Sequence, residues 1–181
     1  MPPRLDLAPY GRVALVTFSA DQQAHPGMDA LATQRFAEAL LASQSGVELL
    51  ELDRADSAVR RVPAGDAPAL AKALGRDKDV PAVFVGELKV SKVKPSGKFS
   101  TAGMHMRASV SAELTVRLIS TRTGGTVWRS SSAAEGTVGR VSLARGLPAV
   151  AMRDQDEAYG EVVHELVAGV TRDLRPTWVK Q

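Results

Sequence analysis

The sequence predicts an α/β fold: a mixed β-sheet with a long antiparallel hairpin, and with the first and last helices packed on one face. Three observations predict it. Apolar residues occupy every second position from Ala108 to Leu118, which is the period of a half-buried strand. Apolar stripes at helical spacing occur from Met28 to Leu40 and from Ala158 to Leu174. Short apolar runs before the first stripe and between the two stripes are typical of buried strands.

The hairpin is predicted to turn at Gly124-Gly125, because Gly-Gly supplies the positive φ of a tight turn. A two-residue turn would set Trp128 opposite Thr121, on the polar face of the hairpin. A bulge would instead move Trp128 into the core. The sequence favours the core, because Trp is rarely left in water without a purpose.

The remaining elements follow from boundary signals. Gly46 suits the left-handed backbone conformation that often ends a helix, and Asp66 suits a helix N-cap. The apolar alternation changes phase at Gly86, which predicts a bulge there. The predicted elements are strands at 12–18, 47–52 and 80–85, a loop at 53–65, a short helix from Asp66 to Gly75, a mobile loop at 93–103, an irregular stretch at 136–148 and a helix at 154–173. We expect a single domain over 1–181, with its core at 11–175 and an extended N-terminal arm at 1–10.

Composition limits the kinds of chemistry that the chain can perform. Its 181 residues are 44% hydrophobic and 24% charged, as in a soluble globular domain. There is no cysteine, which excludes disulfides, zinc–thiolate sites and thiol nucleophiles. No stretch approaches the ~20 apolar residues of a membrane span.

A histidine on the last predicted helix offers one catalytic alternative. His164 lies one turn or less from Glu161 and Glu165, and such a group could bind a metal or act as acid and base. A solvated helix face carries the same residues at the same spacing. We therefore predict no catalytic residue, metal or cofactor, and keep a small metal-dependent enzyme using His164 and Glu161 as the alternative.

Four lysines form the one basic cluster, which we call the basic loop: Lys89, Lys92, Lys94 and Lys98. It could bind an anionic polymer. Aromatic platforms for bases are scarce, since only 4% of the residues are aromatic, so nucleic acid is not a predicted partner.

The polar face of the long strand is the preferred binding surface. Glu113, Thr115 and Arg117 alternate with its apolar residues, and an exposed Trp128 would lie with them. A sheet face that nothing obvious covers favours contact with another protein. These four residues are the predicted partner-binding residues.

Several segments resemble a superfamily of bacterial envelope lipoproteins: the curli secretion channel (CsgG-like), the N-terminal domain of TolB, and activators of penicillin-binding proteins (LpoB-like). They are the strand at Gly11–Phe18, the leucine-striped helix at Met28–Leu41, the strand at Val83–Gly86 and the turn Thr123-Gly124-Gly125-Thr126-Val127-Trp128. The likeness spans roughly 11–174.

The resemblance implies a non-catalytic periplasmic binding or assembly protein, the soluble part of a lipoprotein tethered to the outer membrane. Its partner would be an envelope protein or a cell-wall component, and a homo-oligomer is a further alternative. The chain has no cysteine and no leader-like segment. That fits a mature domain whose lipid anchor precedes residue 1. It equally fits a protein without an anchor, for which a cytoplasmic location is the alternative.

Overall fold

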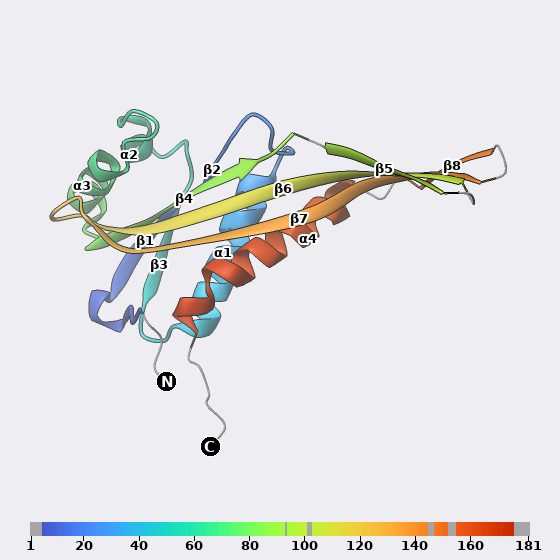
Figure 1. Cartoon of the computed structure of the whole chain (residues 1–181). Helices are drawn as coiled ribbons and strands as arrows, with labels where there is room; N and C mark the ends of the chain where they lie inside the picture. Colours follow the sequence, from blue (N-terminus) through green and yellow to red (C-terminus); the bar gives the residue numbers. More distant parts are fainter. Residues whose placement is uncertain (1–4, 93, 101–102, 145–146, 152–154, 176–181) are drawn as a thin grey trace, which may run out of the picture.

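The computed structural model describes residues 5–92, 94–100, 103–144, 147–151 and 155–175, with side chains at 5–92, 94, 108–137 and 156–175. The described strands form one eight-stranded mixed sheet in the order β3-β1-β4-β6-β7-β8, with β2 beside β4 and β5 beside β6 (Figure 1). The strands are β1 (Arg12–Val16), β2 (Ser19–Ala20), β3 (Glu48–Leu52), β4 (Ala82–Val90), β5 (Lys94–Ser100), β6 (Gly103–Ser120), β7 (Thr126–Ala144) and β8 (Leu147–Ala151). The predicted mixed sheet is confirmed.

Four α-helices flank the described sheet: α1 (Met28–Ser43), α2 (Ser57–Arg60), α3 (Ala67–Lys78) and α4 (Gln155–Val170). The first and last of them lie together on one face, as predicted, and α2 and α3 lie on the other (Figure 1). None of the described helices has the length and apolarity that a bilayer crossing requires. Short 3-10 turns, η1 (Ala8–Tyr10) and η2 (Arg172–Leu174), stand near the two ends.

The inner face of the sheet, which we define as the face toward α1 and α4, carries the larger core. Leu114, Val116 and Leu118 of β6 have no exposed surface there. All seven apolar positions predicted for the last helix are buried: Ala158, Val162, Val163, Leu166, Val167, Val170 and Leu174. Three phenylalanine rings pack at the centre of this core. The ring centroid of Phe36 lies 5.4 Å from that of Phe18 and 5.3 Å from that of Phe84.

Among the described residues, the opposite, outer face is covered only at one end. There α3 packs Ala71 and Leu74 over Val83 of β4 and Ile119 of β6. The side chain of Asp66 caps α3 as predicted, but the helix continues past Gly75 to Lys78 and ends at Asp79, whose φ is 51°. The segment 53–65, predicted as a loop, contains the short helix α2.

The bulge predicted at Gly86 is absent from the described ladder. β4 pairs with β6 without a register shift, from Ala82 opposite Ser120 to Val90 opposite Ala112. The sequence alternation is interrupted because both faces are buried at the start of β4, the outer one under α3, whereas Glu87 and Lys89 beyond it are exposed. Gly86 has a different function: a Cβ there would lie 2.6 Å from Cγ of Phe18, so the glycine makes room for that ring.

The hairpin contains the bulge that moves Trp128 inward. Leu118 pairs with Trp128 and Ile119 with Thr126, so Val127 is the extra residue. Trp128 packs against the inner core, edge-on to Phe84 with centroids 6.0 Å apart. The core position that the sequence favours for Trp128 is therefore confirmed, and the alternative of an exposed Trp128 beside Glu113, Thr115 and Arg117, on which its predicted partner contact depended, is wrong.

Three other predictions are corrected by the backbone. The stretch 93–103 is not a loop where described, since β5 occupies Lys94–Ser100 and pairs with β6. The described part of the stretch 136–148 is not irregular, since β7 runs to Ala144 and β8 begins at Leu147. Residues 5–10 are not an extended arm: they include η1, and Leu7 is fully buried. Asp154, predicted to start the last helix, lies outside the described residues.

Gly86→Ala should destabilise the fold, because the new methyl group and the ring of Phe18 would compete for one space. Phe18 is fully buried and packs on Phe36, so it has no free direction in which to move. We expect the free energy of unfolding to fall by roughly 1–3 kcal/mol. Gly160→Ala in α4 is the control: no atom lies within 4 Å of the added Cβ, so it should gain roughly 0.5–1 kcal/mol from helix propensity. Urea unfolding measures both, and a loss from Gly160→Ala as large as that from Gly86→Ala would contradict the steric explanation.

Trp128→Ala should lower the free energy of unfolding by roughly 3 kcal/mol, since it removes a large aromatic side chain from the core. The neighbouring Val127 is 49% exposed, so Val127→Ala should change stability by less than about 0.5 kcal/mol. Thermal unfolding monitored by circular dichroism compares the two. Equal, small effects would mean that the indole is at the surface.

Candidate functional site

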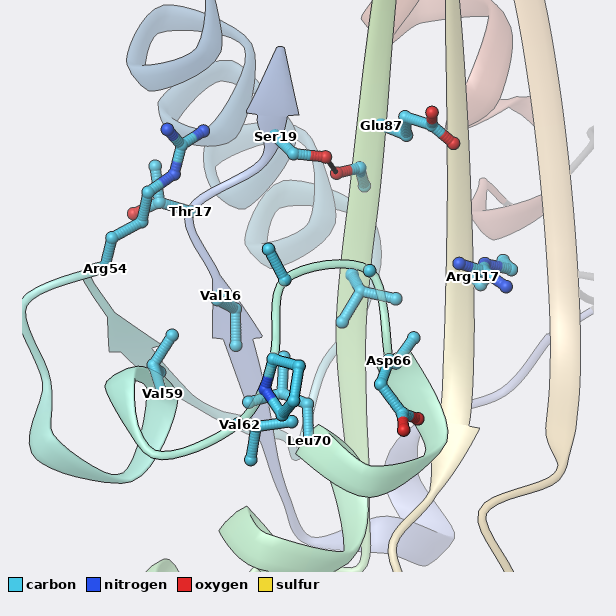
Figure 2. Close-up of a pocket in the computed structure, with 16 residues that line it drawn as sticks. Val16, Thr17, Ser19, Arg54, Val59, Val62, Asp66, Leu70, Glu87 and Arg117 are labelled. Carbon is cyan, nitrogen blue, oxygen red and sulfur yellow. Dashed lines mark hydrogen bonds between the residues drawn. The ribbon is translucent and has the colours of Figure 1, made fainter. Parts of the chain in front are cut away.

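A pocket opens on the outer face, at the carboxyl ends of β1 and β3 and beside β4 (Figure 2). The cavity has a volume of about 420 Å³. Its far wall is the segment that joins α2 to α3 and the start of α3. In open α/β sheets, ligands bind in the crevice outside the carboxyl ends of the strands, so the position is the one expected of a binding site.

A break between β1 and β2 shapes the floor of the pocket. β1 ends at Val16, and the chain then turns aside through two backbone contacts: the N–H of Thr17 donates to the carbonyl of Leu52 at 3.0 Å, and that of Phe18 donates to Oγ1 of Thr33 at 2.9 Å. Ser19 returns to the sheet, and its Oγ donates to the carbonyl of Gly86 at 3.2 Å (Figure 2).

Apolar side chains form much of the wall. They come from β1, the end of α2, the connecting segment, α3 and β4: Val16, Val59, Val62, Leu70 and Val85. Of these, Val59, Val62, Leu70 and Val85 are only partly buried. The pocket is therefore a place where apolar surface remains accessible from solvent.

Four charged side chains surround this apolar wall, and three of them are already engaged. Arg54 forms an ion pair with Asp29 at 3.0 Å and donates to the carbonyl of Phe18. Asp66 accepts from the backbone N–H of Ala69 at 3.0 Å. The carboxylate of Glu87 lies 3.5 Å from Nζ of Lys89.

Arg117 is the fourth charged side chain. It is half-buried and has no ion pair or hydrogen bond to another residue in the described part of the chain. Figure 2 places Arg117 and Glu87 on the sheet side of the pocket and Arg54 on the opposite side. The neighbour of Arg117 on β7 is Arg129, directly opposite in the ladder. Like charges in that position repel, so the site has unneutralised positive charge.

The wall opposite the sheet is held by two ion pairs between α2 and α3. Lys78 donates to Asp56 at 2.8 Å, and Arg61 donates to Asp77 at 2.6 Å. Asp56 also caps α2 by accepting from Ala58. The hydrogen bond from Lys78, followed by that from Ala58, lowers the pKa of Asp56 from its usual 3.8.

Next to the pocket lies a flat surface that we call the outer polar face. It is formed by side chains of β4, β6 and β7 that point away from α1 and α4: Lys89, Ser111, Glu113, Thr115, Arg117, Arg129, Ser131, Ala133 and Glu135. Lys89 faces Glu113 across the strands, and Oγ1 of Thr115 lies 2.9 Å from Oγ of Ser131. Three of the four predicted partner-binding residues, Glu113, Thr115 and Arg117, are thus neighbours on one face.

The predicted basic loop is divided between strands. Lys89 lies on β4, Lys94 and Lys98 belong to β5, and Lys92 is exposed between them. Lys89 is engaged with Glu87. The side chain of Lys98 is outside the described set, so a common binding surface for the four lysines stays a prediction.

The histidine alternative gains no geometric support. His164, Glu161 and Glu165 all lie on the exposed side of α4. No group of three or more His, Cys, Asp or Glu residues able to hold a metal occurs among the described residues.

Sequence reasoning did not find the pocket. Its lining comes from five separate segments between Val16 and Arg117. Asp66, as a helix cap, Gly86, as a predicted bulge, and Arg117, as a polar-face residue, carried a signal in the sequence, but none of these signals indicated a pocket. A pocket of this kind depends on which strands become neighbours, and that is decided by contacts distant in sequence.

No protein-family model and no curated protein sequence matches the chain. Among solved structures, it is similar to a neuraminyllactose-binding hemagglutinin homolog from Helicobacter pylori, at 8% identity and a TM-score of 0.55, covering 90% of this chain and 84% of that one. A PelC dodecamer from Paraburkholderia phytofirmans matches at 18% identity and a TM-score of 0.49, over 98% and 94% of the two chains. The LpoB C-terminal domain from Salmonella enterica matches at 15% identity and a TM-score of 0.43, over 69% and 83%.

At these identities the likenesses show the fold alone. Bacterial lipoproteins occur among the matched structures. The finer resemblance to CsgG-like and TolB-like domains stays a prediction.

Asp56→Asn should make stability less dependent on pH. Folding lowers the pKa of Asp56, so its carboxylate stabilises the fold at pH values above about 3.8 and loses that contribution as the pH falls through the lowered pKa. Asn caps a helix about as well as Asp but carries no charge for Lys78. At about pH 7 we expect a loss of roughly 1 kcal/mol in the free energy of unfolding, and no loss well below the pKa of Asp56. Urea titrations at both pH values measure it; an equal loss at both would show that charge is not the cause.

Proposed function

We propose that this chain is a non-catalytic binding or assembly module of the bacterial cell envelope that contacts another protein through its outer polar face. The carrying observation is the uncovered surface of β6 and β7. These strands are 18 and 19 residues long, against a usual 5–6. Helix α4 packs on their inner side, and α3 reaches only the end near Ile119.

The chemistry of the outer polar face favours a polar, reversible contact. Both signs of charge are present, in Lys89, Glu113 and Arg117, with hydroxyl groups between them. Among the described side chains, the large hydrophobic ones that are exposed, Leu41 and Val127, lie elsewhere. A mixed polar surface of this kind gives specificity through complementary charge.

Its size supports the same conclusion. From Ser111 to Arg117 the strand rises roughly 20 Å, and three strands are roughly 14 Å wide, which makes ~280 Å². A standard interface buries about 800 Å² on each partner. The partner must therefore either reach the neighbouring surface around the pocket or bind weakly.

One observation supports the envelope location, and a second supports the binding role. The segments at Gly11–Phe18 and Thr123–Trp128 resemble those of envelope lipoproteins. The fold is shared with a solved structure that is named for binding neuraminyllactose, and a binding role on such a fold agrees with that name. A lipid anchor on the outer membrane, a cell-wall component as the partner and a homo-oligomer belong to this proposal as its finer alternatives.

Site-specific photo-crosslinking tests the proposed face in cells. The photoreactive residue p-benzoylphenylalanine replaces Ser131 or Ser111 on the outer polar face, or Gln34 on the exposed side of α1 as the control. We expect light-dependent adducts of one defined mass in the envelope fraction from the two face positions and none from Gln34. An adduct of twice the chain mass would identify a second copy as the partner.

A charge reversal, Glu113→Lys, should remove the Ser131 adduct while the melting temperature changes by less than about 2 °C, since exposed sites usually contribute little to stability. Recovery of the protein outside the envelope fraction, or identical adducts from Gln34 and Ser131, would contradict the proposal.

A further inference from the structure

We propose that the pocket beside β4 binds a small amphiphilic anion, with the anionic group at Arg117 and an apolar body between the α2–α3 segment and the sheet. This site is separate from the protein contact proposed for the outer polar face, although Arg117 lies at the border of both. The inference rests on volume, wall chemistry and charge.

The volume suits a small molecule. At about 420 Å³, the pocket falls within the roughly 300–1,000 Å³ of ligand sites. With ~30 Å³ for each water-sized group, it holds about 14 of them. A ligand of about a dozen non-hydrogen atoms would fill it.

The wall favours an apolar body. Val59, Val62 and Leu70 come from one side and Val85 from the other, and all four are only partly buried. Covering apolar surface is favourable by roughly 25 cal/mol per Å². The apolar side chains lie on two opposing walls, which suits a flat or extended hydrocarbon group.

The charge favours an anion over a cation. Glu87 is paired with Lys89 and Arg54 with Asp29, whereas Asp66 accepts from the N–H of Ala69 and keeps its negative charge. Arg117 has no acidic partner among the described residues and faces a second arginine, Arg129. A guanidinium group binds a carboxylate through two parallel hydrogen bonds. A bound carboxylate would satisfy Arg117 and relieve its repulsion with Arg129.

Three matched probes test charge and apolar contact separately: 1-naphthoate, 1-naphthalenemethanol and 1-naphthylmethylamine, which share one ring system and differ in charge. Isothermal titration calorimetry gives the affinities, and amide chemical shifts of ¹⁵N-labelled protein locate the binding. We expect naphthoate to bind at least tenfold more tightly than the alcohol or the amine, with shifts at Thr17, Gly65 and Gly86. Tighter binding of the amine, or shifts confined to β7, would overturn the proposal.

Two arginine variants give the matched control. Arg117→Gln should weaken naphthoate binding roughly tenfold, or about 1.4 kcal/mol, and bring its affinity close to that of the alcohol. Arg129→Gln removes the same charge from the opposite strand, but Arg129 does not line the pocket, so it should change the affinity by less than about threefold. Equal losses from both variants would indicate only a diffuse electrostatic effect and would overturn the assignment of Arg117.

A third variant addresses the apolar wall. Val62 lies in the segment between α2 and α3 and is only half-buried, so Val62→Ser should leave the melting temperature within about 2 °C. It should weaken naphthoate and naphthalenemethanol by a similar factor of about threefold, because it removes apolar contact common to both. Unchanged affinity for both probes would show that the ring does not occupy the pocket.

Discussion

The apolar inner face of β6 has to be buried away from solvent, and most of the architecture follows from that requirement. An alternating strand buries one face only if another layer lies against it. Helices α1 and α4 form that layer, although they stand at opposite ends of the sequence. Close approach is possible because Gly136 of β7 lies under Val162, and Gly169 of α4 lies over Ser132. A side chain at either glycine would push the helix away from the strand.

The aromatic cluster joins this layer to the rest of the sheet. Phe36 comes from α1, Phe84 from β4, Phe18 from the turn between β1 and β2, and Trp128 from β7. Phe18 can reach the cluster only because the chain leaves β1 at Thr17 and because Gly86 makes room. The same turn forms the floor of the pocket. The pocket therefore results from the same packing that forms the core. It lies where β1 ends and where α3 no longer covers the outer face of the sheet.

Local pattern was sufficient to predict elements whose environment is uniform along their length. The stripes of α1 and α4 and the alternation of β6 are of this kind, and the structure confirms them. Prediction failed where the environment changes within an element. Both faces of β4 are buried before Val85, but only one face is buried after it. In the sequence this change looks like a shift in the phase of the apolar alternation. β5, which contains Pro and Gly, and β8, which contains Pro, were missed because their strand character comes from pairing with other strands and not from their own composition.

The candidate site illustrates the same limit. Glu113, Thr115 and Arg117 were placed on one face by alternation alone, and they are neighbours there. The position of Trp128 depends on one extra residue in the hairpin, Val127, which no local signal identifies. The pocket depends on β1 lying beside β4, which are about 70 residues apart in sequence.

Stability alone does not account for the pair of arginines at the border of the two surfaces. Arg117 and Arg129 stand directly opposite each other, although one opposite charge would turn repulsion into attraction. The same sheet does use opposite charges four residues away along the strand, where Lys89 faces Glu113. An arrangement that weakens the free protein is understandable if a negatively charged group completes it. The pocket beside Arg117 has the volume for such a group, and its apolar wall restricts which anions gain from entering. Charge thus explains why an anion would bind, and the wall explains why small inorganic ions would gain little.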